Sequence, residues 1–234
     1  MKDESGIVLG IELSSRQGSL ALLKNGELIG EKSWIADRVR HNTIFQTLET
    51  LIEEAHISYN DISMFAVGRG PGSFSGMRMS FAIAQALALP SKTEVRAVSS
   101  GAALALAVAR EGAKEIAVVG DARRGQVWIG CFQCLEKTNE KDPNSGMVSY
   151  PEREALKPDA VGWKLMPYDE VSVPEGTVVV SPEAERLTEI FPNIGNPRFP
   201  HAKEIAELAA RQTEFEPVEP LYMHPPVFVE PKYA

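Results

Sequence analysis

The sequence predicts an α/β protein made of two related lobes. Its 234 residues are enough for one large domain or for two lobes with a core each, and 44% of them are hydrophobic. Strand and helix patterns alternate along the chain, as in α/β folds. A segment near residue 116 also repeats the pattern of the segment near residue 7. We therefore expect an N-terminal lobe over 1–112 and a C-terminal lobe over 113–212, with the tail 213–234 as a candidate addition to the first lobe.

The first lobe opens with three predicted strands in the stretch "GIVLGIELSSRQGSLALLKNGELIGEKSW". The Asn25-Gly26 pair between its alternating apolar runs is a strong hairpin signal. A helix is expected over 42–55, because six apolar residues recur there at helical spacing. They are Ile44, Phe45, Leu48, Leu51, Ile52 and Ala55.

The rest of the first lobe alternates strand and helix. "DISMFAVGRG", residues 61–70, predicts a strand, and a glycine-rich loop follows it. "SGMRMSFAIAQALALP" predicts a helix that Pro90 ends. Residues 94–112 predict a short strand and another apolar helix.

The second lobe begins with a repeat of the first. "IAVVGDARRGQVWIGCF" can be laid on "IVLGIELSSRQGSLALL", which puts Glu12 and Asp121 at like positions. A polar, turn-rich surface loop is expected over 137–147. Residues 176–191 predict a strand and then a helix, and residues 201–212 a further helix.

The C-terminal tail, "EPVEPLYMHPPVFVEPKYA", carries five prolines. Proline biases the residue before it towards an extended backbone. We expect the tail to run extended across the surface of another element.

The glycine-rich loop "GRGPGSFSGMR", residues 68–78, stands between a strand and a helix. Such a loop can hold an anion with backbone N–H groups, or it can simply turn the chain. Serines replace the third glycine of the dinucleotide fingerprint, and the P-loop lysine is missing. Both interpretations stay open, and the candidate nucleotide- or anion-binding residues are Glu12, Ser14, Gly70, Gly72, Ser73 and Asp121.

The residues give little support for a metal site, a serine nucleophile or a reactive cysteine pair. The four histidines are scattered and form no metal-binding spacing, and neither Ser73 nor Ser75 stands in a G-x-S-x-G elbow. Cys131 and Cys134 fall in a predicted strand, where residues three apart point to opposite faces, so we expect two half-buried structural thiols. We identify no catalytic residue and no metal site.

Net charge and hydropathy indicate whether the chain is expected to bind nucleic acid or to enter a membrane. A formal net charge of −8 argues against binding nucleic acid unaided, because phosphate contacts need a basic face. The sequence shows neither a signal peptide nor an apolar run of the roughly 18–20 residues that span a membrane. A cytoplasmic location is expected.

The predicted helix after the glycine loop carries no charge from Met79 to Ser91. A helix that is apolar all round has to be buried all round. One side can pack on its own sheet, and the other needs either a neighbour within a large two-layer fold or a partner protein. The residues alone leave both possibilities open.

The loop and helix "GRGPGSFSGMRMSFAIAQALAL" resemble the G-x-G-P-G-S-F-T-G-L-R signature of the TsaB (YeaZ-type) family. Further segments agree in order: "LGIELSS", His41 before the first helix, "VSSGAALA", "GDARRGQVW", "ALKPD" and "EPLYM". The resemblance implies an actin/Hsp70/sugar-kinase type of fold with two duplicated α/β lobes.

The resemblance also implies a role in forming N6-threonylcarbamoyladenosine in tRNA, as a non-catalytic scaffold and activator. The implied partners are a TsaD-like transferase and a TsaE-like ATPase, with tRNA only within the complex and a homodimer when the chain is alone. No cofactor is implied for the chain itself, and ATP or ADP with Mg²⁺ belongs to the complex. The implied interface on the first-lobe helices comprises Ile44, Phe45, Leu48, Leu51, Ile52, Met77, Phe81 and Gln85.

Two departures from the family pattern argue against tight ATP binding by this chain. Glu12 stands where the family usually has Asp, and "VVVSPEAERL" has no glycine where an adenosine loop would be. The alternative function is an ATP-binding phosphotransferase or ATPase of the kinase-like fold, with Glu12 and Asp121 around a magnesium nucleotide. A peptidase comes last, because no metal site or nucleophile pair supports it.

Overall fold

The computed structural model describes residues 6–35, 43–134, 148–149, 162–211 and 216–224. Three features of the sequence fall outside these residues: the polar loop expected over 137–147, His41, and the whole "ALKPD" segment, residues 155–159. Among the described residues no helix is both long and apolar enough to cross a membrane.

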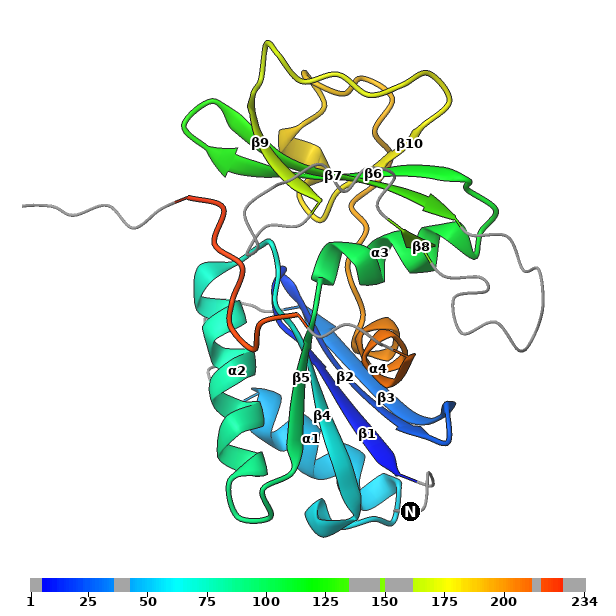
Figure 1. Ribbon diagram of the computed structural model, residues 1–234, viewed down its shortest axis with the longest axis vertical. Helices are drawn as coiled ribbons and strands as arrows, with labels where there is room; N and C mark the ends of the chain where they lie inside the picture. Colours follow the sequence, from blue (N-terminus) through cyan, green and yellow to red (C-terminus); the bar gives the residue numbers. More distant parts are fainter. Residues whose placement is uncertain (1–5, 36–42, 135–147, 150–161, 212–215, 225–234) are drawn as a thin grey trace, which may run out of the picture.

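The first lobe is built on a five-stranded mixed sheet with the order β3-β2-β1-β4-β5 (Figure 1). The strands are β1 (Ile7–Glu12), β2 (Gln17–Lys24), β3 (Glu27–Ile35), β4 (Ile62–Gly68) and β5 (Glu94–Val98). The first three pair antiparallel, and β4 and β5 add to β1 in parallel. Asn25 and Gly26 have φ of 54° and 82°, the left-handed conformation of the tight hairpin turn that this residue pair predicts.

Helices cover both faces of this sheet. The helices α1 (Thr43–Glu54) and α2 (Phe74–Ala88) pack on one face and share its core with β1 and β4. The other face is covered by α4 (Ala202–Arg211). At Gly10 the approach is so close that a Cβ would lie 2.2 Å from the Ala202 carbonyl oxygen, so only glycine fits there.

The remaining helix of the first lobe, α3 (Ser100–Ala109), lies between the two sheets. Some of its side chains join α4, while Leu104 and Val108 join the core of the second lobe. Its nearly complete burial explains why its sequence is apolar all round.

The second sheet repeats the first. Its strands are β6 (Glu115–Arg123), β7 (Gln126–Cys134), β8 (Val148–Ser149), β9 (Trp163–Pro167) and β10 (Val178–Val180). The order β9-β7-β6-β10 matches β3-β2-β1-β4, and β10 runs parallel to β6 just as β4 runs parallel to β1. Glu12 ends β1 and Asp121 lies near the end of β6, so the predicted correspondence between them is confirmed.

Two parts of the chain differ from the sequence-based expectation. In place of a helix after β10 there is a short 3₁₀ helix, η3 (Ala184–Arg186), followed by turns. The helix over 202–211 forms as expected, but it packs on the first sheet rather than within a C-terminal lobe ending at residue 212. Its periodicity showed which side is apolar, not which sheet that side covers.

The two cysteines behave as expected. Both are free and half-buried in β7. Burial raises the pKa of the Cys131 thiol, which makes it a poorer nucleophile than an ordinary cysteine.

Candidate functional site

The glycine-rich loop turns the chain from β4 into α2, and protein acceptors occupy most of its backbone donors. The Arg69 amide donates to the Val98 carbonyl (2.9 Å), the Gly70 amide to Ser100 Oγ (3.0 Å) and the Ser73 amide to the Ser14 carbonyl (2.6 Å). Pro71 has no amide hydrogen. Few N–H groups are left to cradle a phosphate, so the contacts favour a structural turn.

Close packing explains the glycines of this loop. Gly70 has a φ of +100°, in the left-handed region that favours glycine. At Gly72 a Cβ would lie 2.2 Å from the Ser14 carbonyl oxygen. Ser73 caps α2 by accepting a hydrogen bond from the Gly76 amide (3.3 Å).

Glu12 points into the protein instead of into open space. Its carboxyl group is fully buried and accepts hydrogen bonds from the Ser14 amide (2.5 Å) and from Ser100 Oγ (2.6 Å). Burial raises its pKa, although both hydrogen bonds oppose that rise. The group ties the end of β1 to the first turn of α3 and the glycine loop.

A cleft of about 790 Å³ lies between the two lobes. Of the candidate nucleotide-binding residues, Ser14, Gly72, Ser73 and Asp121 line it. Glu12 and Gly70 do not line the cleft, because the loop closes over them.

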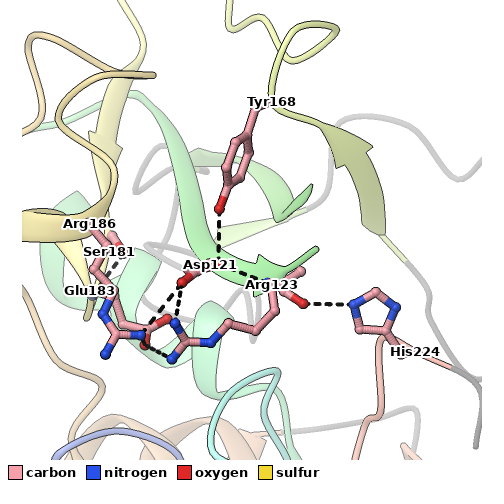
Figure 2. A network of polar contacts seen from close by, with 8 residues as sticks. Asp121, Arg123, Tyr168, Ser181, Glu183, Arg186 and His224 are labelled. Atoms are coloured by element: carbon pink, nitrogen blue, oxygen red, sulfur yellow. Dashed lines mark hydrogen bonds and ion pairs between the residues drawn. The ribbon is translucent and has the colours of Figure 1, made fainter. Parts of the chain in front are cut away.

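Asp121 forms the centre of a polar network on the second-lobe side of the cleft (Figure 2). One carboxylate oxygen contacts Arg123 Nη1 at 2.7 Å and Arg186 Nη1 at 3.5 Å, and the other accepts from the Tyr168 hydroxyl at 3.1 Å. Glu183 lies 3.4 Å from Arg186. Burial raises the pKa of Glu183, and the charge of Arg186 opposes that rise.

The charges that line the cleft are paired within the chain. A third arginine, Arg16 of the first lobe, reaches across to Glu185 at 2.8 Å. Three arginines thus face three acidic residues, all of which line the cleft. The volume is in the range of small-molecule sites, but a polyphosphate would have to compete with these carboxylates for every arginine.

No group of three or more His, Cys, Asp or Glu side chains gathers as a metal site among the described residues. The acidic residues of the cleft instead face arginines. A magnesium nucleotide held by Glu12 and Asp121 is a poor fit, because Glu12 is sealed inside and Asp121 is bridged to two arginines.

The predicted interface residues divide into two groups. Six are buried in the chain's own core, so they position α1 and α2 and cannot face a partner directly: Ile44, Leu48, Leu51, Ile52, Met77 and Phe81. Phe45 is 58% exposed, and Gln85 is also exposed. Except at Phe45, the apolar stripe of α1 therefore packs into the core.

The exposed face of α2 contains large apolar side chains that the predicted interface did not include. Leu89, its C-cap, is 78% exposed, and Met79 is 45% exposed. Phe74 at the start of the helix is 57% exposed. Periodicity alone could not find them, because an uncharged helix gives no signal for the side that meets the sheet.

Comparisons with known proteins agree with the resemblance. A family model described as TsaD, tRNA N6-adenosine threonylcarbamoyltransferase, matches residues 34–156, more than half of the chain. The Escherichia coli (strain K12) tRNA threonylcarbamoyladenosine biosynthesis protein TsaB is 27% identical over 225 residues, covering 92% of this chain and 94% of that protein. The Bacillus subtilis (strain 168) protein of the same name is 31% identical over 126 residues, covering 54% and 55%.

A solved structure extends the likeness to the fold. YeaZ from Pseudomonas aeruginosa has 26% identity and a TM-score of 0.74, covering 93% of this chain and 99% of that one. With the two repeated sheets, this likeness confirms the predicted actin/Hsp70/sugar-kinase type of fold. The chain belongs to the family of the TsaD model, and within it is of the TsaB (YeaZ) type.

Proposed function

We propose that this chain works in the biosynthesis of tRNA threonylcarbamoyladenosine as a non-catalytic subunit. In this role it binds a TsaD-like transferase and holds it in an active arrangement. The near full-length relationship to TsaB proteins supports the pathway. The charged side chains of the cleft pair with one another, which supports a subunit that does not itself catalyse a reaction.

The observation that carries the scaffold role is the outward face of α2. Its exposed residues carry a single charge, on Arg78. They are Phe74, Ser75, Arg78, Met79, Ala82, Gln85, Ala86 and, at the C-cap, Leu89. A solvent-facing surface with large apolar side chains and so few charges is typical of a protein interface.

The neighbouring helix α1 packs on the same face of the sheet and adds Phe45. We infer that the two helices together receive the transferase. When that partner is missing, the same surface would pair two copies of this chain, since a two-fold dimer covers both copies of one patch. A TsaE-like ATPase and tRNA join only in the cytoplasmic complex, where ATP or ADP and Mg²⁺ are held by the assembly.

The test compares the variants Met79→Glu and Leu89→Glu with the wild type. The measurement is the Kd of each for the TsaD-like transferase from the same organism. Both positions are exposed, so the variants should fold, whereas Leu48 and Phe81 are unsuitable because they are buried. Placing a charge in the interface should raise Kd at least about 30-fold, about 2 kcal/mol. Val178→Glu, 41% exposed on β10 of the second lobe, is the control and should bind as the wild type does. Unchanged binding by both α2 variants would refute the proposed surface.

The alternative, an ATP-using enzyme, makes a different prediction for the isolated chain. Calorimetry with Mg-ATP should show micromolar binding if the cleft is a nucleotide site. The paired arginines and the buried Glu12 lead us to expect no such binding. This measurement needs no partner, so it separates the two functions directly.

A further inference from the structure

The tail segment 216–224 crosses from the first lobe to the second (Figure 1). On the first lobe, the Leu221 amide donates to the Arg69 carbonyl at 2.8 Å. On the second, His224 Nε2 lies 2.7 Å from the Ala122 carbonyl oxygen, which can only accept, so this nitrogen is the donor (Figure 2). The side chain of Leu221 is buried and packs into the core of the second lobe. One short segment thus binds both lobes beside the cleft.

An ion pair anchors the start of this segment. Arg69 is only 3% exposed, and its guanidinium donates to Glu216 Oε2 (3.2 Å) and to the Glu219 carbonyl (3.1 Å). The second Glu216 oxygen accepts from the Ser99 amide at 3.1 Å, just before α3. Loss of the Glu216 charge would leave a buried arginine without its counter-ion, which is unfavourable.

The same segment also contacts the glycine loop and the start of α2. Arg69 is itself a loop residue, and the next amide, at Gly70, is held by Ser100. Tyr222 packs against Phe74, the first residue of α2, with ring centroids 5.0 Å apart. Displacing the tail would therefore release the loop and the first turn of α2 together with the second lobe.

We propose that residues 216–224 act as a strap that fixes the two lobes, the glycine loop and the start of α2 in one arrangement, with the Arg69–Glu216 ion pair as its anchor. The strap borders the cleft through Leu221, Tyr222 and His224, so its release would also open that side of the cleft. This role concerns the chain itself and does not depend on the proposed transferase partner.

The test is hydrogen exchange followed by mass spectrometry on the full chain, comparing the wild type with Glu216→Gln and Leu221→Ala. Backbone amides report local opening of the segment that contains them. In both variants we expect peptides over 69–76 and 120–125 to exchange at least about tenfold faster. Peptides from α1 should keep the wild-type rate.

Glu219→Gln is the matched control, because it changes the same residue type on the same segment. The Glu219 side chain is exposed and only its backbone carbonyl meets Arg69, so this variant should exchange as the wild type does. Faster exchange confined to the tail would overturn the proposal, since the tail would then be a passive appendage. Equal acceleration of every peptide, α1 included, would also overturn it, because the tail would then support overall stability and not one arrangement.

Discussion

Replacement of Gly68 by alanine tests the buried contact that joins β1, β4 and α3. A Cβ at this position would lie 1.8 Å from Glu12 Oε2, and 2.7 Å from both Glu12 Cδ and Ser100 Oγ. Real Cβ atoms do not approach other atoms this closely, so the carboxyl group of Glu12 has to move. It is enclosed on all sides, and any move breaks its hydrogen bond with Ser100.

The expected cost has two parts. Inserting a methyl group into a packed core costs about 1–3 kcal/mol. Leaving a buried polar group without its partner costs about 1–3 kcal/mol more. We therefore expect a loss of about 4 kcal/mol of unfolding free energy. For a chain of this size that loss lowers Tm by about 8–16 °C.

Urea denaturation and calorimetry would measure this loss. Gly195→Ala is the matched control, because nothing lies within 4 Å of a Cβ placed there, and it should change stability by less than about 0.5 kcal/mol. The further variant Glu12→Ala removes the carboxyl group that causes the clash, so adding Gly68→Ala to it should cost much less than it does alone. If Gly68→Ala were as stable as Gly195→Ala, the buried position of Glu12 would be wrong.

Three further predictions concern pH, the core and the cleft. Burial raises the pKa of Glu12 above its ordinary value of 4.5. The stability of the wild type relative to Glu12→Gln should therefore be greatest below about pH 4.5 and fall as pH rises through the folded-state pKa of Glu12. Urea denaturation across this pH range would measure the difference. Leu48→Ala should cost about 2–5 kcal/mol of unfolding free energy, and Phe45→Ala less than about 0.5 kcal/mol; equal losses would contradict the burial of the α1 stripe. Asp121→Asn should remove one of the two carboxylates that contact Arg123 and Arg186 and raise the affinity for pyrophosphate about tenfold in calorimetry, an effect that salt should weaken; unchanged affinity would show that the Asp121 carboxylate does not keep anions out.

Local signals in the sequence were enough to predict most elements of the fold. The Asn25-Gly26 turn, the end of α2 before Pro90 and the apolar stripe of α1 each depend on residues close together in the chain. The repeat around Glu12 and Asp121 also predicted the second sheet. Long-range packing was harder: α4 could not be assigned to the first sheet, since its amphipathic pattern fits either one.

The contacts of the candidate site were even harder to predict from the sequence. A carboxylate at the end of β1 predicts a ligand-facing group as readily as a buried one. What turns Glu12 inward is Ser100, 88 residues further along the chain, together with the missing side chain at Gly68. The Arg69–Glu216 pair spans 147 residues and left no signal in the sequence pattern. Such contacts are set by the fold and cannot be read from spacing.

The two sheets share one strand order, but the elements that follow their fourth strands differ. After β4 the chain makes the glycine turn and the long helix α2, whose outer face is apolar and exposed. After β10 it makes only a short 3₁₀ helix, and Glu183, Glu185 and Arg186 there pair with charges around the cleft. The first arrangement leaves an apolar surface exposed, which we propose as the binding site for another protein, while the second pairs the charges that a nucleotide would need. The same type of sheet can therefore be followed by an exposed apolar helix in one lobe and by paired charges in the other. The exposed surface depends on the connection after β4 and the paired charges on the connection after β10, so neither depends on the sheet itself.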